Sequence, residues 1–267
     1  MSPTDPSPLV LVRQENGVAE LTPNRPSVRN ALVDGMLAAL DGALKEAIDD
    51  PETGAILLTG AGPAFCSGAH LTEELAELGA GMTQLILDTL NPALLRIRES
   101  PKPVICALNG AAAGAGVGLA LACDVVVASR SARMILSFSR IGAVLDGGTS
   151  FLLPHIVGPG RAAAMALTGE PIDAETALRF GLVWKLAEDD ELMACCRTLA
   201  EGLARGAASA HAAIKRQLRE CENLSFAEAI GLEAQLQGEA FEAGEPVEGI
   251  SAFREGRLPS FRCFSSD

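Results

Sequence analysis

The 267-residue sequence predicts an α/β fold that ends in a helical region. From residue 9 to about residue 186, short apolar or β-branched runs alternate with helical stretches. This alternation is typical of parallel strands joined by right-handed helical crossovers. From Asp189 onward strand patterns are almost absent, and three helical stretches follow one another. A hydrophobic fraction of 48% is enough for a sizeable buried core.

The first two strands are expected to form a hairpin. LVLVRQ and VAEL flank Asn16 and Gly17, a pair that tolerates the positive φ angles of a two-residue turn. A long helix is expected next, because apolar residues recur every four positions along one stripe. These residues are Leu32, Met36, Leu40, Leu44 and Ile48.

The remaining elements follow the same alternation. Strands are expected in GAILLTG, PVICALNG and DVVVAS, and helices over residues 83–98 and from about Ala115 onward. The C-terminal helices are predicted over residues 192–203, 208–221 and 226–241. These three helices make the last third of the chain a helical appendage.

Acidic residues outnumber basic ones by 34 to 21, which gives a net charge of −13. That charge repels nucleic acids and anionic lipid, so neither is expected as a partner. The longest apolar stretch, residues 110–123, is too short to span a membrane. The start, MSPTDPSPLVLVRQ, has no signal-peptide pattern. We therefore expect a cytoplasmic protein that does not associate with membranes.

Cysteine and histidine usage agrees with that setting. The seven cysteines show no C-x-x-C spacing, which indicates reduced thiols rather than a disulfide framework. His70, His155 and His211 lie far apart in the sequence, so no metal site is expected.

A first glycine-rich turn precedes the helix expected at Ala115. A helix start offers unpaired N–H groups and a partial positive charge, and the small residues Gly114 and Gly116 leave room for an anion. Close packing of a buried helix explains the same small residues equally well. A dinucleotide-binding loop is disfavoured, because Leu119 stands at its third glycine position and no acidic residue follows between Val125 and Leu145.

A second turn lies in GAILLTGAGPAFCSGAHL, where Gly68 and Ala69 follow a strand. A backbone N–H group of this second turn and one of the first turn could both donate to the same oxygen atom. Two such donors form an oxyanion hole, in which each donor contributes about 3–4 kcal/mol. A pair of this kind is sufficient to stabilise the enolate of a thioester.

Six segments make the sequence resemble the crotonase, or enoyl-CoA hydratase/isomerase, superfamily over nearly its whole length. They are NRPSVRNAL, AFCSGAHL, NGAAAGAGVGLALACD, RIGAVLDGGTSFLLPHIVG, LTGEPIDAETALRFGLV and EGISAFREGRLPSF. The resemblance implies a spiral of ββα units with an acyl-CoA site over residues 1–190 and a helical trimerisation region over residues 191–267. It also implies an acyl-CoA thioester as substrate, no tightly bound cofactor, and a homotrimer or a hexamer built as a dimer of trimers.

By this resemblance, the oxyanion donors are the backbone N–H groups of Ala69 and Ala115. Alanine replaces the usual glycine at position 115 and keeps the N–H group. His70 stands where relatives carry aspartate; it could titrate near the thioester or cap the following helix, and we favour the structural role. The two glutamates of enoyl-CoA hydratases correspond here to Gly118 and Phe138, neither of which can move a proton.

Asp146 falls where isomerase-like and dehalogenase-like relatives place a working aspartate. A single base beside an enolate can remove a proton from one carbon and return it to another. Burial among Val144, Leu145 and Phe151 is expected to raise its pKa toward neutrality. The alternative is that Asp146 caps a helix starting at Gly147.

Arginines are the expected contacts for CoA, because the guanidinium fork matches phosphate geometry. Arg25 and Arg29 lie in the motif with which relatives contact CoA, although surface solvation is the alternative for single arginines. The resemblance places further residues along the adenine and pantetheine path, through backbone atoms: Ala31, Ala64, Cys66 and Gly68. Cys66 could react with alkylating agents, but without a paired base it is not expected to be a nucleophile.

The expected activity is therefore a shift of the double bond of an enoyl-CoA between its 3,4 and 2,3 positions, with Asp146 as the base. Two alternatives stay open. One is hydratase, lyase or thioester hydrolase chemistry that uses Asp146, His70 and a water molecule. The other is a non-catalytic acyl-CoA-binding protein, because both hydratase glutamates are replaced.

Overall fold

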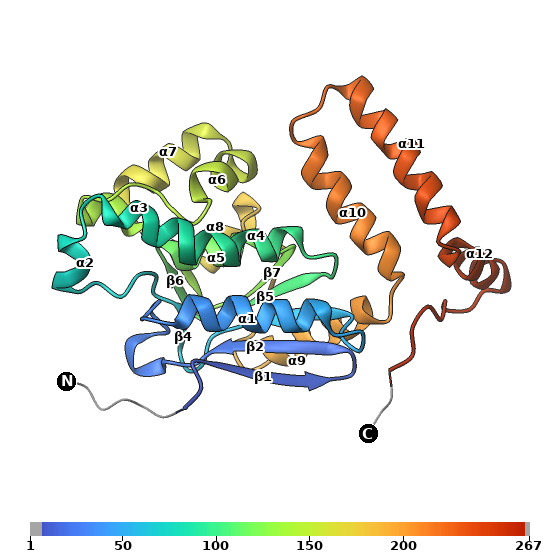
Figure 1. The fold of residues 1–267 in the computed structure, drawn as a ribbon, viewed down its shortest axis with the longest axis horizontal. Helices are drawn as coiled ribbons and strands as arrows, with labels where there is room; N and C mark the ends of the chain where they lie inside the picture. The colour runs from blue at the N-terminus through green and yellow to red at the C-terminus, as the bar shows by residue number, and fades with distance from the viewer. Residues whose placement is uncertain (1–6, 265–267) are drawn as a thin grey trace.

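Two sheets surrounded by helices make up the computed structural model, which describes residues 7–264 (Figure 1). The larger sheet has the order β1-β2-β3-β5-β7-β10 and the smaller one the order β4-β6-β8-β9. The strands of the larger sheet span Val10–Glu15, Val18–Pro23, Ala55–Leu58, Val104–Leu108, Val125–Ser129 and Lys185–Ala187. Those of the smaller sheet span Ala64–Cys66, Ala111–Ala113, Arg133–Ile135 and Ile172–Asp173. The α/β class is confirmed.

The predicted hairpin is present at the edge of the larger sheet. β1 and β2 pair antiparallel, with Glu15 opposite Val18, so that only Asn16 and Gly17 form the turn. Both turn residues have positive φ angles, 51° and 77°. β3, β5, β7 and β10 then add in parallel register, as the predicted crossovers require. Residues 1–6, part of the start that lacks a signal-peptide pattern, lie outside the described residues.

The first helix is shorter than the apolar stripe predicts. α1 spans Met36–Asp49, and the residue before it, Gly35, has a φ angle of 78°. Leu32 lies outside the helix, because its N–H donates to the Gly68 carbonyl and the residue pairs with Ala69. The expected helix start at Leu32 is therefore wrong: a tertiary contact with the second glycine-rich turn takes that residue.

The other helices lie close to their predicted positions. The stretch expected over residues 83–98 forms α3 (Gly81–Leu85), a π-helical turn η2 (Ile86–Leu90) and α4 (Asn91–Glu99), preceded by α2 (Glu73–Glu77). α5 spans Ala115–Ala122 and starts at the predicted residue. The remaining core helices are α6 (Thr149–Val157), α7 (Pro159–Thr168) and α8 (Ala174–Phe180), with 3-10 turns η1 (Pro26–Val28) and η3 (Ser137–Ile141).

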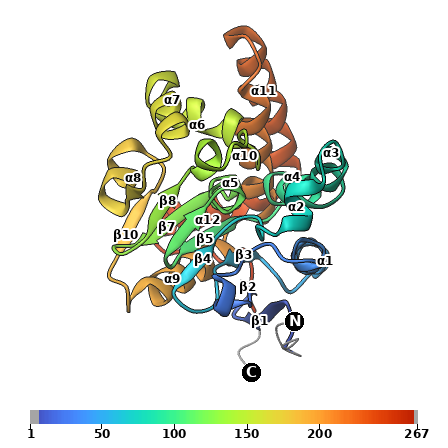
Figure 2. The same cartoon turned by 90° about the vertical axis from the view of Figure 1, so that its left-hand side faces the viewer.

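The two faces of the larger sheet are covered by different helices (Figure 2). Alternate residues of β3 point to opposite faces. Ile56 and Leu58 belong to the large core cluster with α1, α4 and α5, whereas Ala55 and Leu57 pack in a smaller cluster with α9 (Leu192–Ala204). α9 therefore covers the sheet, although the predicted domain division assigns it to the helical region after residue 190. That division stays a prediction.

The last three helices stand beside the core as an arm (Figure 1). They are α10 (Ala208–Cys221), α11 (Phe226–Glu242) and α12 (Glu245–Glu255). The three helices predicted after Asp189 correspond to α9, α10 and α11, and α12 is an additional one. Within the arm only Leu236 and Ala252 are buried. Its large exposed apolar side chains are Ile214, Leu218, Phe226, Ile230, Phe241, Val247, Ile250 and Phe253.

A partly buried ion pair attaches the arm to the core. Lys215 Nζ of α10 lies 2.6 Å from Asp124 Oδ2 and donates to the Lys102 carbonyl at 3.0 Å. Burial lowers the pKa of the Lys215 amine and raises the pKa of the Asp124 carboxyl. Asp124 also accepts from the Val104 N–H, so it joins the arm to the first residue of β5.

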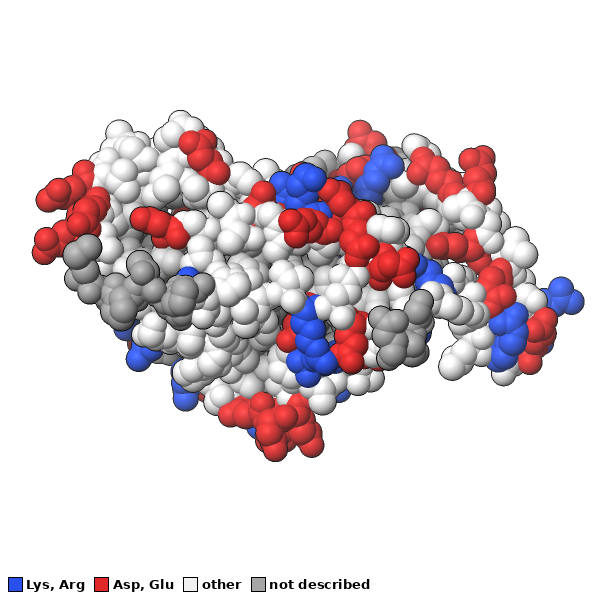
Figure 3. Space-filling view, turned by 60° about the horizontal axis from the view of Figure 1, so that its bottom comes forward, with Lys and Arg blue, Asp and Glu red and all other residues white. Residues whose placement is uncertain are grey.

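The surface agrees with the acidic composition. On the face in Figure 3, basic side chains are scattered and mostly lie beside acidic ones. No helix among residues 7–264 is long and apolar enough to cross a membrane.

Candidate active site

The two glycine-rich turns meet at one end of the smaller sheet. β4 and β6 are parallel neighbours, with Ala64 opposite Ala111, so the turns that follow them leave the sheet side by side. The approach is close: a Cβ atom on Gly116 would lie 2.4 Å from the Cys66 carbonyl oxygen. Likewise, a Cβ atom on Gly68 would lie 2.6 Å from the Ala113 carbonyl oxygen. The small residues thus do pack closely, and this packing brings the two turns together.

Ala69 and Ala115 carry the candidate oxyanion donors. Ala115 is the first residue of α5, so its N–H is one of the four that an α-helix leaves without an internal partner. The hydrogen bonds of residues 7–264 use neither this N–H nor that of Ala69. The site therefore offers two neighbouring free donors at the positive end of a buried helix.

Asp146 lies in a loop that packs directly on α5. The next residue, Gly147, approaches so closely that a Cβ atom on it would lie 3.3 Å from the Ala115 Cα. Asp146 Oδ1 is buried and has no hydrogen-bond partner among the described residues. Burial raises the pKa of this carboxyl to about 6. The raised pKa agrees with the expectation from sequence.

Of the three neighbours expected to bury Asp146, Leu145 packs against the core, but Val144 and Phe151 do not. Val144 is 84% exposed and Phe151 is 41% exposed. The contact with α5 encloses the loop instead, because its backbone reaches Ala115 and Gly118. A loop can turn its apolar side chains outward when its own backbone packs on a helix.

The helix-cap interpretation of Asp146 is wrong. α6 starts at Thr149, its N-cap residue is Gly148, and no side chain caps it. It is the main-chain carbonyl of Asp146 that accepts hydrogen bonds, from the Thr149 N–H at 3.1 Å and from Thr149 Oγ1 at 2.7 Å. Thr149 is fully buried and was missed in the sequence, although a threonine after two glycines is a usable signal for a tethered loop.

His70 does not cap the following helix either. The N-cap of α2 is Thr72, whose side chain accepts from the Leu75 N–H at 3.2 Å. His70 is exposed, directly after the candidate donor Ala69. The structural role favoured for it is therefore not observed.

The positions of the two hydratase glutamates are closed. A Cβ atom on Gly118 would lie 2.2 Å from the Gly147 carbonyl oxygen, so the Asp146 loop fills the space of any side chain there. Phe138 is buried, and its ring lies 3.8 Å from the position of a Cβ atom on Gly114. Apolar or main-chain atoms thus occupy both places.

The candidate CoA residues surround the loop before α1. Arg29 is exposed, and its carbonyl accepts from the Ser67 N–H at 3.0 Å. The Arg25 guanidinium binds main-chain carbonyls, among them that of Asn24 at 2.6 Å, so it holds the chain in place. Ala31, Ala64 and Gly68 are buried, which leaves only backbone contacts to them.

Cys66 is not a reactive thiol. Its side chain is buried, and burial raises the pKa of the thiol to about 11. Only the thiolate reacts readily with alkylating agents. The expected alkylation is therefore contradicted by the absence of both access and ionisation.

Asn30 is a structural residue of the site that the sequence reasoning missed. Its Nδ2 donates to the carbonyls of Ala61 and Ala64, each at 2.8 Å, and its Oδ1 accepts from the Arg25 N–H. Asn30 is fully buried with a φ angle of 53°, a conformation that asparagine tolerates. It fixes the Arg25–Ala31 loop against the strand that leads to Ala69.

A cavity of about 270 Å³ lies behind the Asp146 loop, between α4, α5 and α6. It is lined by Asn91, Leu94, Leu95, Arg98, Ala122, Gly147, Gly148, Phe151 and Leu152. Gly147 thus contacts α5 and also borders this cavity, which Gly148 lines as well.

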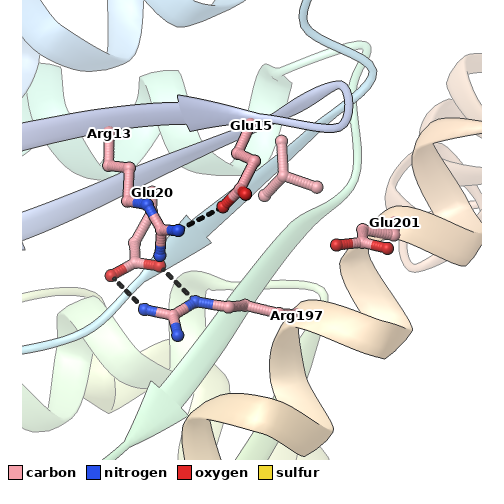
Figure 4. Close-up of a pocket in the computed structure, with 6 residues that line it drawn as sticks. Arg13, Glu15, Glu20, Arg197 and Glu201 are labelled. Atoms are coloured by element: carbon pink, nitrogen blue, oxygen red, sulfur yellow. Dashed lines mark hydrogen bonds and ion pairs between the residues drawn. The ribbon is translucent and has the colours of Figure 1, made fainter. Parts of the chain in front are cut away.

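A second hollow, between β1, β2 and α9, is filled by charged side chains rather than open to a ligand (Figure 4). Arg197 of α9 pairs with Glu20 at 2.8 Å, and Arg13 pairs with Glu15. The free volume is only about 10 Å³. These ion pairs hold α9 against the hairpin. Nowhere in residues 7–264 do three His, Cys, Asp or Glu side chains gather as a metal site would require.

Fold and site together define a crotonase-type protein, and comparisons with known proteins agree. The enoyl-CoA hydratase/isomerase family model matches residues 13–263. A Rhodobacter capsulatus protein named "Probable enoyl-CoA hydratase" is 43% identical, over 92% of this chain and 94% of its own length. The 1,2-epoxyphenylacetyl-CoA isomerase of Escherichia coli is 37% identical, over 94% and 97%.

Among solved structures, an enoyl-CoA hydratase from Polaromonas sp. JS666 superposes with a TM-score of 0.89. It is 32% identical, over 95% of this chain and 99% of that one. The chain belongs to the enoyl-CoA hydratase/isomerase family of the crotonase superfamily.

Proposed function

We propose that this protein binds an acyl-CoA thioester and moves the double bond of an enoyl-CoA between its 3,4 and 2,3 positions. The observation that carries the proposal is the Asp146 carboxyl, whose buried Oδ1 has no hydrogen-bond partner among the described residues, on the loop that packs against Ala115. The N–H groups of Ala69 and Ala115 would hold the thioester oxygen.

The reaction needs one base and one oxyanion site. The Asp146 carboxylate takes a proton from C2 of the 3-enoyl thioester, and the C–H electron pair moves toward the thioester oxygen, which gives a dienolate. Asp146, now protonated, returns that proton to C4, while the double bond forms between C2 and C3 and the thioester carbonyl is restored. Neither a second acid nor a water molecule is needed.

The pKa of Asp146 supports this role. A value of about 6 leaves most of the carboxyl ionised at neutral pH and makes the carboxylate a stronger base than that of an ordinary aspartate. Burial causes the shift, and among residues 7–264 no cation lowers the pKa of this carboxyl.

Hydration by a glutamate pair is disfavoured. Main-chain atoms of Gly147 fill the space that a side chain at residue 118 would need, and the second glutamate position is occupied by the buried ring of Phe138. Relatives of both kinds exist, one named as a hydratase and one as an isomerase, so their names alone do not choose between the activities. The proposal also includes a reducing, cytoplasmic setting, in line with the unpaired state of all seven cysteines.

The decisive experiment mixes the protein with short and medium 3-enoyl-CoA thioesters and follows conjugation of the double bond by ultraviolet absorbance. We expect conjugation by the wild type and a loss of about 10²-fold or more in Asp146→Asn, as for removal of a general base. Binding of the thioester, measured by calorimetry, is expected to persist in the variant. Equal turnover by wild type and Asp146→Asn would overturn the role of Asp146.

Product analysis separates the alternatives. A 3-hydroxyacyl product from a 2-enoyl-CoA would indicate hydration, and released CoA would indicate thioester hydrolysis. Tight binding of several acyl-CoA thioesters without conversion of any would indicate a binding protein.

A further inference from the structure

The Asp146 loop approaches α5 closely between Gly118 and Gly147. A Cβ atom on Gly118 would lie 2.2 Å from the Gly147 carbonyl oxygen, 2.8 Å from its carbonyl carbon and 2.9 Å from its Cα. All three are main-chain atoms, so no side-chain rotation can relieve the clash. The loop can adopt its position only because residue 118 has no side chain.

Few other contacts hold the loop in that position. Thr149 tethers the Asp146 carbonyl from the α6 side. Gly147 and Gly148 also border the cavity of about 270 Å³ between α4, α5 and α6, so there is open space beside the loop. The carboxyl itself forms no bond through Oδ1 that could fix it. Its distance from Ala115 is therefore set by how closely Gly147 seats on α5.

We propose that Gly118 is a positioning residue: the absence of its side chain lets the Asp146 loop seat against α5 and places the carboxylate beside the Ala115 N–H. This inference rests on the proposed role of Asp146. Gly118 touches no substrate; it acts through Gly147.

The cavity also determines what a substitution would do. A methyl group at residue 118 would push Gly147 away from α5, and the open space behind the loop could receive it. The fold should therefore survive while the carboxylate moves by roughly 1 Å, a displacement that can reduce a rate by about 10²-fold.

Gly118→Ala tests this, with Gly202→Ala as the matched control. Gly202 is also a helical glycine, in α9, and a Cβ atom there would have nothing within 4 Å. Hydrogen exchange of residues 145–149 is expected to become faster in Gly118→Ala and to stay unchanged in Gly202→Ala. With a 3-enoyl-CoA, kcat should fall by about 10²-fold in Gly118→Ala while KM stays close to the wild-type value.

A rescue separates positioning from general damage. The longer carboxylate of Asp146→Glu, introduced into Gly118→Ala, should recover at least part of the lost kcat; the same change in the wild type should lower it. A Gly118→Ala protein with faster loop exchange but wild-type kcat would overturn the inference. So would a loss of kcat that Asp146→Glu cannot recover at all.

The two proposals fail separately. If Asp146→Asn retained full turnover, the proposed function would fall, whatever Gly118→Ala does. If Asp146→Asn were inactive while Gly118→Ala kept the wild-type kcat, only the positioning role would fall.

Discussion

At the scale of single residues, two aspartates beside the core differ in their hydrogen-bond partners. Asp124 faces Lys215 and the Val104 N–H, whereas Asp146 Oδ1 has no partner among the described residues. An unpaired buried carboxylate lowers the stability of the fold. Such a group is therefore expected only where function needs it. Asp146 has this cost on the loop that packs against Ala115, whose N–H has no partner among the described residues, and uncompensated groups of this kind are typical of active sites.

This cost gives a stability prediction for Asp146→Asn. The folded-state pKa of about 6 lies above the usual value of 3.8, so ionisation opposes folding. The penalty begins as pH rises above the unfolded pKa and is complete above the folded one. We therefore expect Asp146→Asn to raise the free energy of unfolding by about 1–2 kcal/mol at pH 8, after allowance for solvent screening, and by about zero at pH 3.5.

Urea denaturation of both proteins at the two pH values provides the measurement. Asp50→Asn serves as a control of opposite sign: hydrogen bonds from Gln14 and from the Glu52 N–H lower the pKa of Asp50, so its ionised form stabilises the fold. An Asp146→Asn variant that is less stable than the wild type at pH 8 would contradict the uncompensated burial of this carboxyl.

At the scale of elements, α10 is attached to the core mainly through polar contacts. None of its residues is buried, yet Lys215 reaches Asp124 and the Lys102 carbonyl, and Arg219 donates to the Arg98 carbonyl at 3.0 Å. The Lys215 side chain is largely removed from water and the Asp124 side chain is partly so, and removing the amine leaves the Asp124 carboxylate without its cation.

Lys215→Met should therefore loosen the arm. We expect a loss of about 3 kcal/mol in the docking of α10, seen as faster hydrogen exchange along residues 208–221 and easier proteolysis near residue 206. Arg216→Met on the same helix is the control, because its ion pair with Glu220 is solvent-exposed and contributes about 0.5 kcal/mol or less. Equal exchange in both variants would show that apolar contacts hold α10 instead.

At the scale of the whole molecule, the arm exposes large apolar side chains on each of its three helices, as interaction surfaces do. Phe253 is 87% exposed, and Phe226, Val247 and Leu218 are similarly open. Exposed apolar side chains on three successive helices are stabilised when another protein surface buries them. A second copy of the chain offers such a surface, because it carries the same apolar side chains. We propose the homotrimer, or the dimer of trimers, that the resemblance implies.

Light scattering after size exclusion tests the assembly. The wild type should have three or six times the 27.6 kDa mass of one chain. Phe253→Asp should shift the protein toward monomer, since it would place a charge in the apolar contact, and Phe253→Leu should not. A monomeric wild type at micromolar concentration would contradict the proposal.

The sequence by itself determined the fold class, the hairpin at Asn16 and Gly17, the start of α5 at Ala115 and the three helices after Asp189, because each depends on local periodicity or on turn chemistry. Tertiary structure decided the rest. Because Leu32 bonds to the Gly68 carbonyl, α1 starts at Met36 and not at the predicted Leu32. Packing of the surrounding elements also buries the Cys66 thiol. It also turned Val144 outward and seated Gly147 on Gly118. These outcomes depend on contacts between segments distant in the chain, about which local pattern carries no information.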